Sequence, residues 1–361
     1  MNILMVLDHR FPSDIRVENE AESLIAAGHE VSLLIIDEAD GPAGEEYKGM
    51  RIIRHRLKNT YREKMRGLLS FLPVYSWYLG NVIANIADRE SMDAIHVHDL
   101  YLAGAGVRAK NKTGIPLVTD LHENYVAAVQ YYAWSTRIPG KWFVSVKKWK
   151  ELEQKWLQAS DLIITVIEEN RDRLKALGIP ESKMTVTPNT LNTRDFDEYH
   201  LKPDKPLRQY DEVLLTYIGG FDAHRGLEHL IEAAKLLDND GLNFRLIMVG
   251  DGRTRPETEA KVGSLGIQDR VIFEGWQPLS KVRSYIENSD ICLIPHVKNK
   301  HTDTTIPHKL FQYMYCSKPV VSTNCAPIER IIKETGAGFI YPSGDAPSLA
   351  QVLKELIASP E

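Results

Sequence analysis

Hydrophobic residues along the chain fall into short runs that alternate with segments of helical spacing. Runs typical of strands cover residues 2–7, 30–36, 50–56, 93–98, 116–121, 161–166 and 184–188 in the first half, and 212–218, 244–249, 270–274, 290–294, 318–322 and 338–341 in the second. Helical spacing is clearest over residues 15–27, 75–90, 142–158 and 168–177. Strands this apolar, separated by helices, are typical of parallel sheets covered on both faces. The pattern therefore predicts an α/β protein with two consecutive Rossmann-like, doubly wound parallel-sheet domains.

A polar linker is predicted between the two domains. Residues 200–212 read HLKPDKPLRQYDE, with two prolines, many charges and no periodic apolar face. This places an N-terminal domain at 1–200, a linker at 201–212 and a C-terminal domain at 213–361. In doubly wound folds, ligands bind in the crevice beyond the carboxyl ends of the strands. We therefore expect both domains to face a central cleft that is lined by the loops following strands.

Composition and charge exclude several classes of protein. The net charge is -5, so the chain is no polycation and no nucleic-acid partner is expected. Three cysteines, Cys292, Cys316 and Cys325, lie far apart without CxxC spacing, which argues against a disulfide framework or a thiolate zinc site. The apolar run in the opening MNILMVLDHR is too short for a secretory signal, and no stretch approaches the ~20 apolar residues of a spanning helix. A cytoplasmic protein is expected.

The glycine-rich loop after the run at 212–218 is the strongest local signal. It reads YIGGFDAHRG, and Gly219 and Gly220 let a ligand approach the backbone closely. Arg225 precedes a helix that opens near Gly226. The helix dipole disfavours a cation there, unless a bound anion interacts with both the arginine and the free N–H groups of the helix. The pattern indicates an anion-binding loop. An exposed arginine in an ordinary turn is the alternative.

Two further loops follow strands in the same half. Gly250 belongs to VGDGRTR, which is either a nucleotide-facing turn or a tight turn that needs positive φ. After the run at 290–294, a polar loop leads into a helix, and Lys309 and Gln312 lie three apart on one face of that helix. Both can reach one ligand, although ordinary solvated side chains would show the same spacing. The backbone amides that suit an anion at this helix N-terminus are those of Thr304, Thr305 and Ile306.

In its sequence strings, the second half resembles the nucleotide-binding domain of retaining, GT-B fold glycosyltransferases of the group 1 family, similar to family 4. The strings that match are IGG…HRG, MVGDG, VIFEGW and IPHKLFQYM…KPVV, followed by Glu329. The first half resembles the acceptor domain of the same family in FPSDIRVENEAESLIAAGHEV, VHDLY, TDLHENY, SDLIITVIEENRDRL and TPNTLNTRDF. The strings follow the order of the family across nearly the whole chain.

The resemblance implies roles for individual residues. Arg225 stands at the position of the family's lysine that grips the donor diphosphate, and Lys309 adds a second cation. Gln312 and Thr304 stand where the family has paired glutamates, one of which holds the nucleotide ribose. His122 matches a histidine close to the transferred sugar. Candidate acceptor contacts in the same half as His122 are Asp14, Arg16, Asp99 and Glu123.

The activity implied by the resemblance is metal-independent transfer of a hexosyl-type sugar from a nucleoside diphosphate donor, with retention of configuration and no further cofactor. The replaced glutamates leave open a non-catalytic nucleotide-sugar-binding relative, and a sugar-nucleotide epimerase or hydrolase on the same fold is a further alternative. An NAD-dependent oxidoreductase is disfavoured because no G-x-G-x-x-G follows a strand. No DxD-like acidic pair follows a strand either, although Asp8, Asp14 and Asp120 near strand ends are carboxylates that a metal could use.

Basic residues beside aromatic ones suggest where the acceptor is found. Residues 54–66 hold six Lys/Arg and one Glu, and they precede GLLSFLPVYSWYLGNVI. Residues 141–157 interleave lysines with Trp142, Trp149 and Trp156 on one helical face. Such segments suit the surface of an anionic bilayer, whereas the alternative makes these tryptophans core contacts of an amphipathic helix. The expected acceptor is a saccharide or a lipid-linked saccharide, and a peripheral location on the inner face of the membrane is a second expectation.

Overall fold

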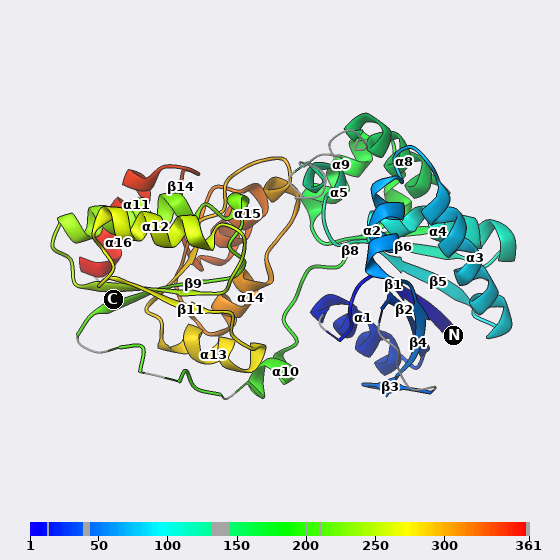
Figure 1. The fold of residues 1–361 in the computed structure, drawn as a ribbon, viewed down its shortest axis with the longest axis horizontal. Coiled ribbons are helices and arrows are strands. Elements are labelled where there is room, and N and C mark those ends of the chain that lie inside the picture. Colours follow the sequence, from blue (N-terminus) through cyan, green and yellow to red (C-terminus); the bar gives the residue numbers. More distant parts are fainter. Residues whose placement is uncertain are drawn as a thin grey trace. The chain divides into compact units, whose positions relative to one another are not determined.

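The structure is a computed structural model of the 361-residue chain, and it describes residues 1–12, 14–38, 44–130, 145–199, 201–204, 206–208 and 211–358. The chain divides into two compact units, unit 1 (Met1–Pro188) and unit 2 (Asn189–Glu361). Each unit holds one sheet built mainly of parallel strands with helices packed against it (Figure 1). The two α/β domains predicted from the sequence are confirmed.

Unit 1 is built on an eight-stranded sheet in the order β3-β4-β2-β1-β5-β6-β7-β8. All neighbouring strands are parallel except β3 and β4, which are antiparallel. The sequence pattern missed β3, because a strand of two residues gives no alternation to detect. The strands are β1 (Asn2–Leu7), β2 (Glu30–Asp37), β3 (Glu46–Tyr47), β4 (Met50–Arg56), β5 (Ala94–His98), β6 (Leu117–Leu121), β7 (Leu162–Thr165) and β8 (Met184–Val186).

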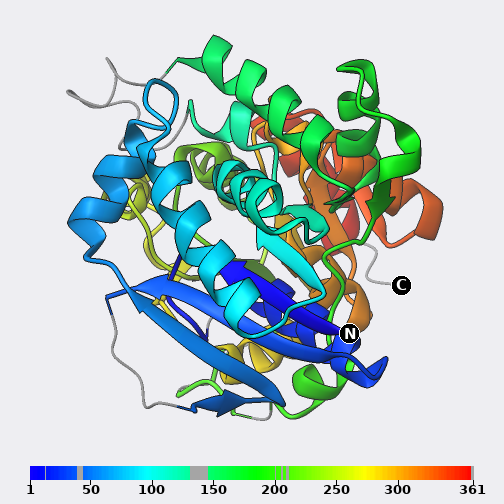
Figure 2. The ribbon, with the colours of Figure 1, turned by 90° about the vertical axis from the view of Figure 1, so that its right-hand side faces the viewer.

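Helices cover both faces of this sheet. The helices of unit 1 are α1 (Ile15–Ala26), α2 (Asn59–Gly67), α3 (Val74–Arg89), α4 (Leu100–Thr113), α5 (Tyr125–Ala128), α8 (Val146–Ala159), α9 (Glu168–Ala176) and the 3-10 turn η1 (Glu181–Lys183). Strand β1 shows how its sequence serves two cores. Leu4 and Val6 belong to the cluster formed with α3, α4 and α8, whereas Met5 and Leu7 pack with Val17 of α1 on the other face. Figure 2 shows light-blue and cyan helices lying over the blue strands.

Unit 2 is built on a six-stranded parallel sheet in the order β11-β10-β9-β12-β13-β14 (Figure 1). The strands are β9 (Val213–Ile218), β10 (Phe244–Val249), β11 (Val271–Gly275), β12 (Ile291–Ile294), β13 (Val320–Thr323) and β14 (Gly338–Tyr341). The helices are α10 (Thr193–Asp197), η2 (Ala223–Arg225), α11 (Leu227–Asn239), α12 (Arg255–Leu265), α13 (Leu279–Asn288), η3 (Thr302–Thr304), α14 (His308–Tyr315), α15 (Ala326–Thr335) and α16 (Ala346–Ala358). Buried apolar residues of α11 and α16 pack on this sheet in one core.

The division between the units precedes the expected linker at 201–212, because the segment after Pro188 bonds into unit 2. The amide of Asn189 donates to the Ile306 carbonyl at 3.3 Å. In α10, Asp197 accepts from Tyr315 at 2.8 Å and from Arg283 at 2.7 Å. These polar contacts follow no apolar period, so the linker composition of the next residues was the stronger sequence signal.

The structure decides between the two interpretations given for the tryptophans of helix α8. Trp149 and Trp156 are buried, and the Trp149 ring lies 4.9 Å from that of Tyr125 between centroids. They are core contacts of an amphipathic helix, so a bilayer-facing role for them is wrong. Trp142 lies outside the described residues. Among the helices of the described chain, none is both long and apolar enough to cross a membrane.

Candidate functional site

In unit 2, the loops after β9 and β10 touch each other backbone to backbone. The Gly219 N–H donates to the Val249 carbonyl at 2.9 Å, and a Cβ on Gly250 would lie 2.0 Å from the Gly219 carbonyl oxygen. Gly226 is equally constrained, with φ of 67° and with the Pro295 carbonyl oxygen 1.9 Å from where a Cβ would be. Glycine at these positions is therefore required by close backbone approach, which the sequence had suggested.

Lys309 of α14 extends to this pair of loops. Its ammonium lies 4.1 Å from the centre of the Tyr217 ring, and a Cβ on Gly219 would lie 2.8 Å from Nζ. The side chain is buried, and Nζ has no hydrogen-bond partner among the described residues. Burial and the nearby charge of Arg225 hold the pKa of Lys309 well below its ordinary range. A buried cation without a partner is costly unless a ligand supplies an anion.

Arg225, in η2, belongs to the same group of cations. Its Nη1 donates to Nε2 of His296 at 2.9 Å, and its buried Nε has no hydrogen-bond partner in the described part of the chain. Burial, together with the charges of Arg225 and Lys309, holds the pKa of His296 well below its usual value. A neutral imidazole can accept from the guanidinium and fix its direction. Sequence reasoning identified Arg225 and missed His296, which is the second residue after the end of β12.

The residues predicted to bind the donor before and within α14 differ in whether their polar groups are already bonded within the protein. Thr304 donates its N–H to the His301 carbonyl at 3.0 Å and its hydroxyl to the Lys300 carbonyl at 2.6 Å. Its amide is thus engaged within its own loop, and the expectation of an open amide at Thr304 is wrong. The equivalent roles of Thr305 and Ile306 stay predictions. Gln312 is buried on the same helix as Lys309, and Gly220 follows Gly219 at the end of β9.

In unit 1, Arg16 and Asp120 form a buried pair. Nε and Nη2 of Arg16 donate to the two Asp120 oxygens at 2.8 and 2.7 Å, and Nη1 donates to the Thr187 carbonyl at 2.8 Å. Asp120 ends β6 and is fully buried. Although burial opposes its ionisation, the charges of His122 and Arg16 hold the pKa of Asp120 well below its ordinary range. The sequence had offered Arg16 as an acceptor contact, whereas its bonds make it a fixed counter-ion.

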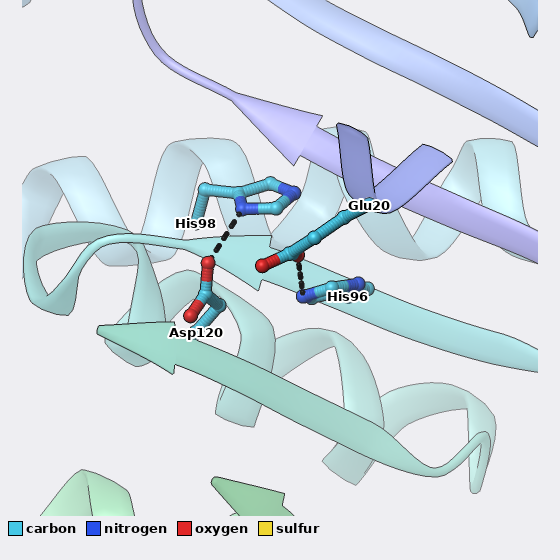
Figure 3. Close-up of side chains that lie close together, drawn as sticks. All are labelled: Glu20, His96, His98 and Asp120. Carbon is cyan, nitrogen blue, oxygen red and sulfur yellow. Dashed lines mark hydrogen bonds and ion pairs between the residues drawn. The ribbon is translucent and has the colours of Figure 1, made fainter. Parts of the chain in front are cut away.

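A second buried group lies next to this pair (Figure 3). His96 and His98 project from the same face of β5, and Glu20 lies one turn after Arg16 in α1. Ligand atoms of Glu20, His96, His98 and Asp120 all lie within 4.8 Å of one another, a spacing that a metal ion could use. Arg16 Nη2 also lies 2.8 Å from Glu20 Oε1. A cation bound here would therefore have to displace a guanidinium from both carboxylates.

His122 follows β6 and lies among three carboxylates. Its Nε2 is 2.8 Å from Asp120 Oδ2, and its Nδ1 is 3.9 Å from Asp14 and 4.0 Å from Asp99. Burial disfavours the charged imidazole, but Asp99, Asp120 and Asp14 together raise the pKa of His122 to about 10. His122 is therefore an imidazolium at neutral pH, fixed in orientation on one side by Asp120. The structure brings the predicted residues His122, Asp14 and Asp99 together.

Local backbone structure positions the two carboxylates that face Nδ1. Asp14 caps α1 by accepting from the N–H groups of Arg16 and Val17, each at 3.1 Å. Asp99 links β5 to α4 with φ of 71°, a conformation that costs energy for a residue with a side chain. Its carboxylate accepts from Tyr101 at 2.9 Å. Glu123 is half-buried in the same loop as His122, and its acceptor role stays a prediction.

Asp8 lies apart from this cluster. It accepts a hydrogen bond from Tyr75, and its oxygens lie 3.4 Å from Arg62 and 3.7 Å from Arg66. Burial raises the pKa of Asp8 to about 6 in spite of these arginines. Each of the three carboxylates considered for a metal thus has a partner within the protein. Asp8 pairs with arginines and a tyrosine, Asp120 pairs with Arg16, and Asp14 caps a helix.

The unit 1 network contains residues that sequence reasoning missed. Glu20, His96 and His98 were not singled out, and Asp120 was considered only as a metal ligand. Two spacings would have indicated them. The pair His96 and His98 has the period of two that places side chains on one strand face, and Glu20 follows Arg16 at the helical interval of four.

Comparisons with known families agree with this arrangement. The family described as "Glycosyltransferase Family 4" matches residues 14–195, and the family described as "Glycosyl transferases group 1" matches residues 212–359. One relative, the amylovoran biosynthesis glycosyltransferase AmsK of Erwinia amylovora, is 28% identical over 203 residues, which are 55% of this chain and 47% of AmsK. The chain thus aligns with about half the length of that relative.

Solved structures resemble the whole chain. Sucrose-phosphate synthase of Thermosynechococcus elongatus has a TM-score of 0.75 and 19% identity, covering 99% of this chain and 90% of its own. Anabaena HepE in complex with UDP-glucose has a TM-score of 0.69 and 17% identity, with coverage of 99% and 90%. Identities this low show the fold alone, which is that of two-domain GT-B proteins.

Proposed function

The chain belongs to the group 1 glycosyltransferases of the GT-B fold, and from this premise we propose that it transfers a hexosyl-type sugar from a nucleoside diphosphate donor to a saccharide acceptor. The acceptor is a growing polysaccharide or a lipid-linked saccharide. The relative AmsK supports this choice, because its name assigns it to amylovoran biosynthesis.

The single observation that supports donor binding most strongly is the buried ammonium of Lys309. It has no hydrogen-bond partner among the described residues and points to loops that only glycine can form. The unpartnered Nε of Arg225 lies in the same group of cations. A buried ammonium without a partner, next to a half-buried guanidinium whose Nε has no partner among the described residues, suits a diphosphate, because its oxygens accept several charge-assisted hydrogen bonds.

In the proposed reaction, the acceptor oxygen forms a bond to sugar C1 while the bond from C1 to the diphosphate oxygen breaks. The electron pair of the broken bond stays on the nucleoside diphosphate, and the acceptor proton passes to that leaving group on the same face, so that configuration is retained. Arg225 and Lys309 stabilise the charge that develops there, and each contributes roughly 10²–10³ in rate, as donors to an oxyanion do. These two side chains supply positive charge without a metal ion.

The proposal gives His122 the role of a hydrogen-bond donor. Its pKa of about 10 keeps the ring protonated at neutral pH, so it has no free lone pair with which to act as a general base. The imidazolium donates to a sugar hydroxyl and opposes proton loss, while Asp14 and Asp99 limit the cost of its charge. The neighbouring Glu123 is proposed as an acceptor contact.

A non-catalytic nucleotide-sugar-binding protein is the second candidate, favoured by Gln312 and Thr304 in place of the family's glutamates. A glutamine still accepts a hydrogen bond through its carbonyl, but it lacks the negative charge. An epimerase or hydrolase would require no acceptor. These candidates differ in whether sugar leaves the donor and where it goes, which an experiment can follow directly.

The test is a thermal-shift panel of UDP-, GDP-, ADP- and TDP-sugars, with EDTA or with magnesium, followed by NMR of the sugar and phosphorus signals. A donor at 100 times its Kd adds about 2.7 kcal/mol of stability. One base class should stabilise the protein equally with EDTA, and Arg225→Ala should abolish the shift. Arg253→Ala, which removes an exposed arginine paired with Asp222, is the matched control. No shift with any donor would refute the proposal, and a shift without sugar transfer would identify a binding protein.

A further inference from the structure

The turn between α2 and α3 exposes several apolar residues that are close in sequence. Phe71, Leu72 and Val74, together with Pro73 between them, are consecutive exposed residues, and Trp77 follows one turn later. The exposed fractions are 43% for Phe71, 52% for Leu72, 45% for Val74 and 56% for Trp77. We call residues 71–74 and Trp77 the apolar corner. A contiguous patch of large apolar side chains marks an interaction site more often than a lone exposed residue does.

The apolar corner is not the solvent-side remainder of a poorly packed helix. On the opposite side of α3, Tyr75, Leu79 and Ile83 are fully buried in the core of unit 1. The helix thus has a complete buried face as well as an exposed apolar one. Folding of unit 1 does not account for the second face, because these side chains remain in contact with water.

Cations surround the apolar corner. The ammonium of Lys148 in α8 lies 4.1 Å from the centre of the Phe71 ring, and the guanidinium carbon of Arg108 lies 5.5 Å from that of Trp77. Further exposed lysines flank the corner in sequence on α2 and in space at the start of α8: Lys58, Lys64, Lys147 and Lys150. The acidic residues among the exposed positions of these two segments are Glu63 and Glu151. The apolar corner therefore has two cations on its aromatic rings and further lysines on the neighbouring segments.

We propose that the apolar corner inserts into the headgroup region of an anionic bilayer while the lysines of α2 and α8 bind lipid phosphates. A bilayer interface accepts both parts, because aromatic and branched side chains enter the acyl boundary and cations remain at the headgroups. A basic protein partner would not supply complementary charge, and a nucleic acid would leave Leu72 and Val74 in water. The charge and the apolar surface together fit an anionic lipid surface.

This inference narrows which part of unit 1 faces lipid. The sequence had offered residues 54–66 with the string GLLSFLPVYSWYLGNVI, which contains the apolar corner, and also the tryptophans of α8. Two of these tryptophans are buried, so α8 contributes only its lysines. Membrane binding would bring the enzyme to a lipid-linked acceptor, and that consequence rests on the proposed function. The binding itself requires no catalytic activity.

The test is sedimentation with vesicles rich in phosphatidylglycerol, compared with vesicles of phosphatidylcholine alone. We expect binding only to the anionic vesicles, and release in about 1 M salt, where the Debye length falls to about 3 Å. The variant Leu72→Glu/Val74→Glu should weaken binding at least about tenfold, because it removes two side chains that each contribute when buried. Trp276→Glu, which changes an exposed tryptophan of unit 2, should leave vesicle binding unchanged.

A second measurement locates the contact. Brominated lipids should quench the fluorescence of Trp77 in the wild type, and Trp77→Phe should remove most of this quenching. The proposal would be overturned if the wild-type protein did not bind anionic vesicles, or if the double variant bound them as well as the wild type does. The thermal shift with donor serves as an independent readout: the double variant should retain it, so a failure of lipid binding is distinguishable from a failure of the proposed function.

Discussion

Replacing Lys309 by methionine should stabilise the ligand-free protein and impair donor binding. The ammonium is buried, without a hydrogen-bond partner in the described chain, and its pKa is held below the ordinary range by burial and by Arg225. Methionine fills a similar volume and removes the unsatisfied donor, which should recover about 1–3 kcal/mol. A unit of this size responds by about 2–4 °C per kcal/mol, so Tm should rise by about 2–12 °C.

Donor should stabilise the wild type more than it stabilises Lys309→Met. At 100 times its Kd a donor stabilises the wild type by about 2.7 kcal/mol. A charge-assisted contact to phosphate contributes roughly 1.5–3 kcal/mol, so its loss weakens binding about 10- to 100-fold. At the same donor concentration the variant should therefore gain less than about 1.4 kcal/mol. Differential scanning calorimetry with and without donor measures both effects.

The wild type should also become more stable as pH rises from neutral towards the ordinary lysine pKa of about 10.4. The sign follows because the folded-state pKa of Lys309 is lowered, so the unfolded chain binds more protons over this range. Lys309→Met should lack this slope. Lys300→Met, at an exposed lysine, is the control and should change neither Tm nor donor response. A variant less stable than the wild type without donor, or one with an undiminished donor shift, would refute the reasoning.

Three further predictions follow from contacts elsewhere. Burial raises the pKa of Asp8 to about 6, so the folded chain binds more protons than the unfolded chain between about pH 4 and pH 6, and the unfolding free energy should fall by roughly 3 kcal/mol over this range. Urea titrations of Asp8→Asn should lack this fall. A variant with the same pH profile as the wild type would contradict the assignment. Arg16→Met should cost about 3–5 kcal/mol in chemical denaturation, because it leaves Asp120 buried without its counter-ion; a loss under 1 kcal/mol, far below about 3, would show that the pair is dispensable. Gly219→Ala should weaken donor binding in calorimetry through a clash with the lysine ammonium, whereas Gly28→Ala, also at positive φ but with open space around it, should not.

The fold could be predicted from sequence because its signal is local and repeated. Thirteen of the fourteen strands correspond to predicted apolar runs, and only the two-residue β3 was missed. The boundary was harder, since Asn189 and Asp197 join unit 2 through individual polar bonds that leave no periodic trace. Composition suggested a linker further along the chain, where prolines and charges are dense.

Residues of the site could be predicted where the local sequence alone marks them. Gly219 and Arg225 were found because they belong to a strand-to-helix connection, and Lys309 because it lies in the first turn of the helix that follows another such connection. The partners that define their state come from other elements: His296 fixes the Arg225 guanidinium from the loop after another strand. Likewise, the sequence suggested that Arg16 contacts an acceptor, but its bidentate bond to Asp120 spans more than a hundred residues. No local pattern reports such a pairing.

The backbone contact between Gly219 and Gly250 has a consequence for directed evolution of this pocket. A side chain at Gly250 would collide with the Gly219 carbonyl, whereas one at Gly219 would meet the end of the Lys309 side chain, so Gly250 is the position of the two that tolerates substitution less. Substitution of Arg225, which belongs to the same group of cations as Lys309, leaves this backbone contact intact. A library aimed at a new nucleotide should therefore randomise Arg225 and Gln312 and leave Gly250 unchanged, because a side chain at Gly250 would displace the backbone of the neighbouring loop.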